Sequence, residues 1–236
     1  MILKKLGIEK KDLLIPASIL VGAVFIAFGI FLSSGKSFSN GDKVDVAKND
    51  QQNTQQNTGN VKVDKRDNAA TIGKGKVQVI EFSDFQCPYC KQFYTEVFGQ
   101  LKTKYIDTNK ITFTFRNFPL PFHQNAEKAA EAGECANRQG KFWQYHDTLF
   151  EKANGDGTGL EIASLKKYAS DLGLDTNKFN SCLDNGEAAD VVKKDTSDGT
   201  KAGVSGTPTI VIDGKLLVGA MPYANFEQEI EAALKK

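Results

Sequence analysis

The sequence predicts an α/β fold with a mixed sheet, in the order β-α-β, a helical block and β-β-α, preceded by one transmembrane helix. Three observations support this prediction. Short runs rich in β-branched residues, bounded by turn residues, lie before and after the helical block. Residues 124–203 repeat apolar side chains with helical spacing. Residues 13–32 carry no charge, and a helix of this length spans about 30 Å, the thickness of a bilayer's hydrocarbon core.

The uncharged segment 13–32 is the first element, and we expect it to be an uncleaved membrane anchor. A cleaved signal peptide is the alternative, but its apolar region would be about 7–15 residues long and would end at a small-residue cleavage site. Here the apolar run is longer, and Ser33-Ser34-Gly35-Lys36 makes a weak cleavage site. The longer run therefore favours the anchor.

The lysines near this segment predict its orientation. Four lysines precede the apolar run and two follow it closely. By the positive-inside rule, residues 1–12 remain in the cytoplasm and everything after Leu32 is extracytoplasmic. That compartment allows stable disulfides.

Residues 33–60 are almost devoid of apolar side chains and include a stretch rich in Gln, Asn and Thr. Such a segment cannot bury enough surface to offset its chain entropy. We expect a flexible polar linker here, followed by one folded domain at 61–236.

Within the domain, hydrophobic periodicity predicts each element in turn. A strand, a helix and a second strand form a β-α-β unit, which requires a parallel pair with a right-handed crossover. After the helical block, the turn at Asp213-Gly214 predicts an antiparallel hairpin. The predicted elements are the strands Val77–Phe82, Ile111–Phe115, Thr209–Ile212 and Lys215–Val218, and the helices Cys87 to about Tyr105 and Phe226–Leu234.

Charge excludes one class of function. The chain has 30 basic and 29 acidic residues, for a formal net charge of +1. A near-neutral domain lacks the basic surface that binds a nucleic-acid backbone. We therefore expect no nucleic-acid partner.

The motif Cys87-Pro88-Tyr89-Cys90 carries the chemistry. It follows a predicted strand directly and begins a predicted helix. Free N–H groups and the helix dipole favour a thiolate at the first cysteine. Pro88 fits the first turn because its missing N–H costs nothing there. This spacing predicts thiol–disulfide exchange.

Two other interpretations of the motif remain. A zinc half-site would need two more ligands, and the candidates His123, His146, Cys135 and Cys182 show no paired ligand spacing. A purely structural disulfide within the motif is the other alternative. We expect no metal and no separate cofactor, because the dithiol itself would be the redox centre.

Two segments carry a family resemblance: EFSDFQCPYC (Glu81–Cys90) and GVSGTPT (Gly203–Thr209). With the intervening RNFPLPFHQNAEKAAEAGECANRQGKFWQYHDTLF, they resemble the DsbA-like group of thioredoxin-fold proteins, close to its membrane-tethered thiol:disulfide oxidoreductases. The resemblance covers roughly residues 72–236. It implies a thioredoxin fold with a helical subdomain inserted at about 122–203.

The resemblance also implies roles for individual residues. Cys87 matches the exposed attacking thiol, and Cys90 matches the buried resolving thiol. Thr207-Pro208 matches the cis-proline loop that packs against the dithiol and presents backbone to the substrate chain.

Glu81 is the candidate proton acceptor or donor for Cys90. It lies on a strand predicted to be buried, where a carboxyl group has a raised pKa. The resemblance supports this role, and the alternative is a Glu at an exposed strand edge. Tyr89 supplies no cation to stabilise a thiolate, so we expect a less oxidising site than the roughly −120 mV of DsbA.

The remaining candidates are expected to be structural. In an oxidising compartment Cys135 and Cys182 would pair, closing a loop that could contribute up to roughly 4 kcal/mol; a second redox pair or two free thiols are the alternatives. The histidines His123 and His146 are interpreted as solvated or helix-capping. We expect Phe122, Phe142, Trp143 and Tyr145 to pack in the core and the subdomain, with a place in a peptide groove as the alternative for some of them. Arg116 is expected to form a local salt bridge.

Together these features predict an extracytoplasmic enzyme that exchanges disulfides with exported cysteine-containing proteins, in the oxidase direction. A membrane redox partner, quinone-linked as in the resembled family, would reoxidise it. A reductase or isomerase using the same site is the first alternative. A copper carrier using Cys87, Cys90 and a histidine is the second.

Overall fold

The computed structural model describes residues 60–236. The predicted cytoplasmic segment, membrane anchor and nearly all of the linker lie outside this range. Among the residues it describes, none of the helices is both long and apolar enough to cross a membrane.

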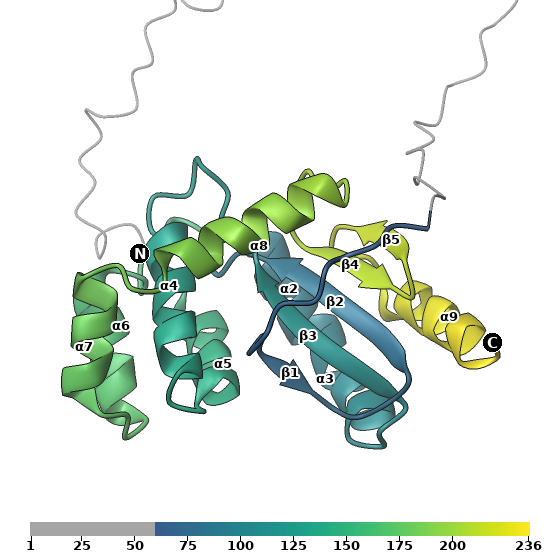
Figure 1. Cartoon of the computed structure of the whole chain (residues 1–236), viewed down its shortest axis with the longest axis horizontal. Coiled ribbons are helices and arrows are strands. Elements are labelled where there is room, and N and C mark those ends of the chain that lie inside the picture. Colours follow the sequence, from purple (N-terminus) through teal and green to yellow (C-terminus); the bar gives the residue numbers. More distant parts are fainter. Residues whose placement is uncertain (1–59) are drawn as a thin grey trace, which may run out of the picture. The chain divides into compact units, whose positions relative to one another are not determined.

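The sheet has five strands in the order β1-β3-β2-β4-β5 (Figure 1). As predicted, β2 and β3 are parallel, and β4 and β5 form an antiparallel hairpin next to β2. Asp213 and Gly214 both adopt positive φ in the hairpin turn, which a two-residue turn of this kind requires. The strands are β1 (Thr71–Ile72), β2 (Val77–Ser83), β3 (Ile111–Asn117), β4 (Thr209–Ile212) and β5 (Lys215–Val218).

Strand β1 was not predicted. It is two residues long and pairs antiparallel with the edge of β3. Two residues are too few for a period-two pattern to appear in a sequence.

The helix that begins within the CPYC motif runs without a break from Pro88 to Ile106, in agreement with the prediction. It comprises α2 (Pro88–Phe93), the π-helical turn η2 (Tyr94–Phe98), α3 (Gly99–Leu101) and a second π-helical turn, η3 (Lys102–Ile106). The remaining helices are α4 (Ala126–Asn137), α5 (Phe142–Lys152), α6 (Ile162–Asp171), α7 (Thr176–Asp184), α8 (Ala189–Lys201) and α9 (Tyr223–Leu234).

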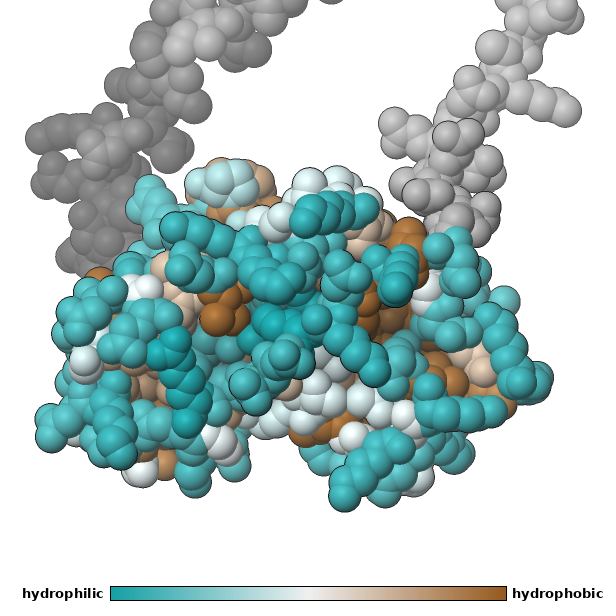
Figure 2. Space-filling model, viewed as in Figure 1, coloured by the Kyte–Doolittle hydropathy of each residue, from teal (hydrophilic) through white to brown (hydrophobic). Residues whose placement is uncertain are grey.

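Alternation along β2 assigns side chains to the two faces of the sheet. Val77 and Val79 face a core shared with the helix that follows the motif and with α9. Phe82 faces a smaller core on the opposite side, next to Gly199 of α8. On that side the extended segment 60–70 also crosses the sheet (Figure 1). Figure 2 shows that hydrophilic residues dominate this view, with apolar residues in small separate patches.

Helices α4 to α7 form a helical subdomain, and its core also includes residues of the active-site segment and of β3. Helix α8, which lies within the expected insertion at about 122–203, packs against Phe82 and Phe118 at Gly199. Asp175 caps the N-terminus of α7 by accepting a hydrogen bond from the Lys178 N–H at 3.1 Å. The subdomain core includes Phe85, which stacks on Phe115 of β3 and contacts Phe150 of α5. Since Phe85 lies two residues before Cys87, the subdomain is packed directly against the active-site motif.

A buried ion network joins the sheet to the helices and to segment 60–70. Arg116 of β3 pairs with Asp195 and Asp198 of α8. The predicted salt bridge is present, but it is not local, because these acids lie 79 and 82 positions away. Arg66 pairs with Glu134 of α4 at 2.8 Å and with Asp195 at 2.9 Å. The partners of Arg116 come from far along the chain.

Candidate active site

The two cysteines of the motif occupy the start of α2. Cys87 is the N-cap residue and has extended backbone angles, and Pro88 is the first helical residue. The Cys87 carbonyl accepts a hydrogen bond from the Lys91 N–H at 3.1 Å, which closes the first turn around Cys90. Pro88 therefore lies in the first helical turn, as predicted.

Cys87 is buried, with 3% of its surface exposed, so the prediction of an exposed attacking thiol is wrong for this structure. Its Sγ donates a hydrogen bond to the carbonyl of Thr207 at 3.4 Å. Cys87 also belongs to the subdomain core, together with Phe150 and Ala153. The loop before β4 and the subdomain together leave the sulfur little exposed surface.

The surroundings of Cys87 favour its thiolate. A hydrogen bond from the Cys90 thiol is the main cause that lowers the pKa of Cys87, to about 6. The Thr207 side chain and the backbone N–H groups of Tyr89 and Cys90 act in the same direction, and burial opposes them.

Cys90 has the opposite environment. It is fully buried, and burial followed by the neighbouring Cys87 raises its pKa well above the ordinary value. The backbone N–H of Asp84 donates a hydrogen bond to its Sγ at 3.4 Å. One thiol thus favours the nucleophilic thiolate, and the other keeps its proton.

Glu81 lies on β2 with 1% of its surface exposed, paired in register with Phe115 of β3 and Ile210 of β4. It is therefore inside the sheet rather than at an exposed edge. Burial raises the pKa of Glu81 to about 8. Its Oε1 has no hydrogen-bond partner within residues 60–236, and the same holds for the hydroxyls of Ser83 and Thr207.

The loop between α8 and β4 contains the cis peptide bond Thr207–Pro208. The Pro208 carbonyl accepts a hydrogen bond from the Gly219 N–H at 2.7 Å, which ties this loop to the end of β5. Tyr89 is 62% exposed beside it. A groove of about 340 Å³ lies next to the dithiol, lined by Tyr89, Gln92, Thr207, Val218, Gly219, Ala220 and Met221.

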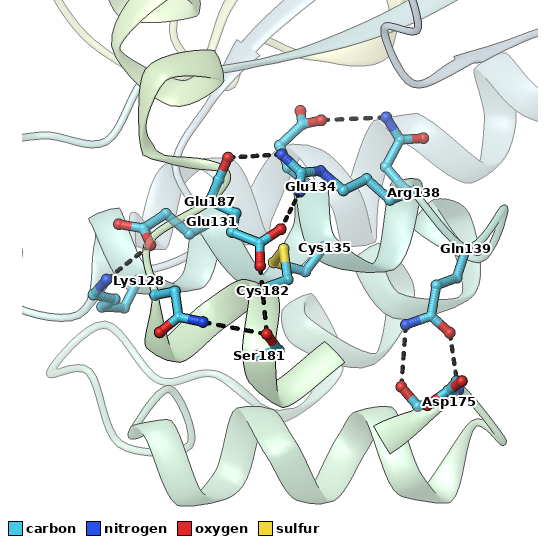
Figure 3. The surroundings of a disulfide bond; sticks show 12 residues. Lys128, Glu131, Glu134, Cys135, Arg138, Gln139, Asp175, Ser181, Cys182 and Glu187 are labelled. Atoms are coloured by element: carbon cyan, nitrogen blue, oxygen red, sulfur yellow. Dashed lines mark hydrogen bonds and ion pairs between the residues drawn. A yellow bond between two sulfur atoms is a disulfide. The ribbon is translucent and has the colours of Figure 1, made fainter. Parts of the chain in front are cut away.

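Cys135 of α4 and Cys182 of α7 are joined by a disulfide, with a Cα–Cα distance of 5.9 Å. Figure 3 shows the polar contacts around it. Arg138 pairs with Glu187 at 2.8 Å, and the Gln139 side chain bonds both backbone groups of Asp175. The disulfide joins α4 to α7, and both of its cysteines lie far from Cys87 in the sequence.

The histidines differ from the sequence interpretation. His146 is buried, and it lies in an aromatic cage with ring centroids 4.9–6.0 Å away. Burial lowers its pKa. The cage consists of Phe85, Tyr94, Phe98, Phe115, Phe142, Trp143 and Phe150. His123 contacts Asp84 and is neither free in solvent nor a helix cap.

Three of the four aromatic residues expected to pack do so. Phe142 and Tyr145 are buried, and Trp143 packs partly buried against both main cores. Phe122 is 72% exposed and does not belong to a core. It lies in the loop before α4, where a helical pattern gives no information about burial.

Sequence reasoning missed two polar residues beside the motif. Asp84 hydrogen-bonds several groups around the dithiol, and Lys91 donates to the Ala153 carbonyl at 2.6 Å, which links α2 to the end of α5. Position within EFSDFQCPYC was a signal for Asp84. Among residues 60–236, no group of three or more His, Cys, Asp or Glu side chains could hold a metal ion.

Comparison with known proteins decides the family. A family model described as thioredoxin matches residues 65–232. The chain belongs to the thioredoxin superfamily. Disulfide bond formation protein D of Bacillus subtilis is 32% identical over 167 residues, covering 67% of this chain and 73% of that protein. This relative places the chain among the DsbA-like thiol:disulfide oxidoreductases.

Solved structures agree with this family. Oxidised BdbD of Bacillus subtilis superposes with a TM-score of 0.68 and 27% identity, covering 75% of this chain and 98% of that one. Wolbachia pipientis alpha-DsbA1 gives a TM-score of 0.63 and 25% identity, covering 72% and 93%. The thioredoxin-like fold with a mixed sheet is therefore confirmed.

Another group of relatives is much longer than this chain. The Na(+)/H(+) antiporter NhaA 3 of Salinispora tropica is 36% identical over 151 residues, which is 64% of this chain. The chain spans 22% of that antiporter's length. The similarity concerns one part of the antiporter.

Proposed function

We propose that this chain is an extracytoplasmic thiol:disulfide oxidase that forms disulfides in exported proteins through Cys87 and Cys90. The observation that carries this proposal is the unequal environment of the two thiols. The Cys87 thiolate is favoured, and Cys90 is buried beneath it. A stabilised thiolate stabilises the reduced enzyme, which makes its disulfide a stronger oxidant.

In the oxidase direction, a client thiolate attacks Sγ of Cys87 in the Cys87–Cys90 disulfide. The disulfide breaks, a mixed disulfide forms between the client and Cys87, and the electron pair stays on Cys90, which takes up a proton. A second client thiolate then attacks the client sulfur and expels Cys87 as a thiolate. Two electrons pass to the enzyme, and the client gains one disulfide.

Glu81 is the proposed proton donor and acceptor for Cys90. Its carboxyl is buried and protonated near neutral pH, since its pKa is about 8. It can give a proton as Cys90 leaves and take one back as Cys90 is reoxidised.

The remaining site residues would support the exchange. Thr207 and Pro208 present backbone to a bound client, and Pro88 begins the helix. Tyr89 carries no positive charge, so we expect a potential below the roughly −120 mV of DsbA. Cys135–Cys182 would be structural, and no cofactor beyond the dithiol is needed.

We include the location of the chain in the cell in the same proposal. The segment 13–32 would anchor the chain, with residues 1–12 in the cytoplasm and the domain outside. A membrane redox partner would accept the electrons. A reductase or isomerase would use the same two cysteines, and the potential decides between these directions.

The test is the reduction potential of the full-length chain in detergent, equilibrated with glutathione buffers and trapped by alkylation of Cys87. A value above about −180 mV would support a disulfide donor, and one below about −230 mV would establish a reductase instead. A value between them would indicate an isomerase. If Cys87 does not exchange at all, and instead the reduced protein binds Cu(I) stoichiometrically, the carrier hypothesis replaces the enzyme.

A further inference from the structure

Asp84 is a buried carboxylate between β2 and the CPYC motif. Its Oδ1 accepts a hydrogen bond from the Gln86 N–H at 2.8 Å, and its Oδ2 accepts one from the Leu120 N–H at 2.9 Å. Oδ2 also lies 2.7 Å from Nδ1 of His123. An ionised carboxylate can only accept, so with Asp84 ionised the proton of this third contact belongs to His123.

The backbone of Asp84 contacts both active-site cysteines. Its N–H donates to Sγ of Cys90 at 3.4 Å, and its carbonyl accepts from the Cys87 N–H at 3.1 Å. A displacement of Asp84 would therefore change contacts of both cysteines.

The side chain of Asp84 fastens this turn to the segment 118–125. That segment leaves the carboxyl end of β3, which is the parallel neighbour of β2. Leu120 and His123 both belong to it, and both bind the same carboxylate oxygen. Gln86 makes a second link, because its side-chain oxygen accepts a hydrogen bond from the Asn125 N–H at 2.9 Å. The loop is thus tied to the turn before the dithiol, and Asp84 binds two of its residues.

An ionised Asp84 would also act on the thiols. A buried negative charge disfavours a nearby thiolate, and a hydrogen-bond donor such as His123 offsets that effect. The other titratable groups nearby are Glu81 beneath Cys90, and Glu127 of α4 and Lys193 of α8. These last two line a groove of about 510 Å³ that His123 also borders.

We propose that Asp84 and His123 are positioning residues for the exchange reaction. Asp84 holds its own N–H against Cys90, and His123 holds and compensates the Asp84 carboxylate. This proposal rests on the function proposed above, with Cys87 and Cys90 as the redox centre.

The reaction step shows why this position matters. When a client thiolate attacks Cys87, the Cys87–Cys90 bond breaks and its electron pair moves to Sγ of Cys90. The Asp84 N–H already donates to that sulfur, so it stabilises the leaving thiolate until the proton arrives.

The test compares His123→Ala, His123→Asn and Asp84→Asn in the full-length chain in detergent, with Glu127→Gln as the control. Asn is chosen because its side-chain NH₂ can occupy the place of Nδ1. Two quantities are measured: the rate at which reduced glutathione opens the Cys87–Cys90 disulfide, and the titration of the Cys87 thiolate by ultraviolet absorbance. Glu127→Gln changes a charge on the same groove, and Glu127 has no hydrogen bond with Asp84 or His123.

We expect His123→Ala to slow the exchange about tenfold, which corresponds to about 1.4 kcal/mol, and to raise the pKa of Cys87. His123→Asn should restore the rate to within about threefold of wild type, because a donor to Asp84 remains. Asp84→Asn removes the buried charge and should lower the pKa of Cys87. Glu127→Gln should behave as wild type.

Opposite shifts from Asp84→Asn and His123→Ala would separate an electrostatic role from general damage to the fold. Shifts in the same direction, or a His123→Ala variant that exchanges and titrates as wild type, would overturn the proposal. If Asp84→Asn does not fold, the two His123 variants test the proposal. The measurements are then the loss of exchange rate in His123→Ala and its recovery in His123→Asn. A wild-type protein that does not exchange would refute the proposed function, and the Cys87 titrations would still judge the Asp84–His123 pair.

Discussion

At the scale of single residues, the environment of each active-site thiol decides whether it can carry a negative charge. Cys87 and Cys90 lie one helical turn apart, yet the pKa of Cys87 falls to about 6 and that of Cys90 rises. Cys87 receives hydrogen bonds at the helix start, whereas Cys90 is fully buried next to Cys87 and Glu81. The same burial raises the pKa of Glu81.

Glu81→Gln tests the buried carboxyl by its pH dependence. Because the folded-state pKa of about 8 exceeds the ordinary 4.5, the stability due to the protonated form is complete below pH 4.5 and is lost as pH rises toward 8. Gln stays neutral throughout. We expect the variant to be more stable than wild type by on the order of 3 kcal/mol near neutral pH, and equally stable in acid.

Urea unfolding across this pH range measures the difference. The same variant should slow reoxidation of Cys90 roughly 100-fold, since a positioned proton acceptor is lost. A stability difference independent of pH would show that folding does not raise the pKa of Glu81.

At the scale of elements, α4 connects the active-site motif to the rest of the subdomain. Its Gly133 leaves so little room that a Cβ there would lie 3.3 Å from the ring of Phe85. One helical face thus touches the motif, and Cys135 fastens the helix to α7. Helix α4 therefore needs a small residue at Gly133, two positions before the cysteine of the disulfide.

Replacing both Cys135 and Cys182 by Ala should lower the free energy of unfolding by up to about 4 kcal/mol, because a loop closed across 47 positions becomes free in the unfolded chain. Guanidinium unfolding measures it. Ser181→Ala, next to Cys182, is the control and should change stability by less than about 0.5 kcal/mol. Exchange at Cys87 should persist. Loss of exchange in a folded double variant would indicate a redox relay instead.

At the scale of the whole domain, buried charges join parts that are distant in sequence. Arg116 of β3 lies between two acids of α8, and Arg66 links one of them to Glu134 of α4. These contacts connect segment 60–70, the sheet, the subdomain and α8. Removing Arg116 would take away the cation that binds both acids of α8, so that among residues 60–236 only Arg66 would pair with Asp195 and only the exposed Lys194 with Asp198.

Arg116→Met should therefore destabilise the domain by roughly 3–5 kcal/mol. Arg138→Ala provides the matched control, because its ion pair with Glu187 is half exposed and should contribute less than about 1 kcal/mol. Thermal unfolding of both variants gives the comparison. Equal losses from the two variants would contradict a special role for the buried network.

The sequence alone determined the features that depend on neighbouring residues. Strands β2 to β4 follow from period-two or β-branched runs. The turn at Asp213-Gly214 follows from two residues that tolerate positive φ, and β5 follows as the hairpin partner across it. The position of Cys87 and Pro88 at a helix start is equally local. Each depends on interactions within a few positions, so a single sequence contains the necessary information.

The tertiary structure decided what depends on contacts between distant segments. The burial of Cys87 involves Thr207, which is 120 positions away, and residues of the helical subdomain. The partnership of Asp84 with His123 spans 39 positions, and that of Arg116 with Asp195 spans 79. A polar residue carries no local sign of the partner it will meet. Whether such a side chain is solvated, buried or paired is settled when the sheet, α8 and the helical subdomain pack together.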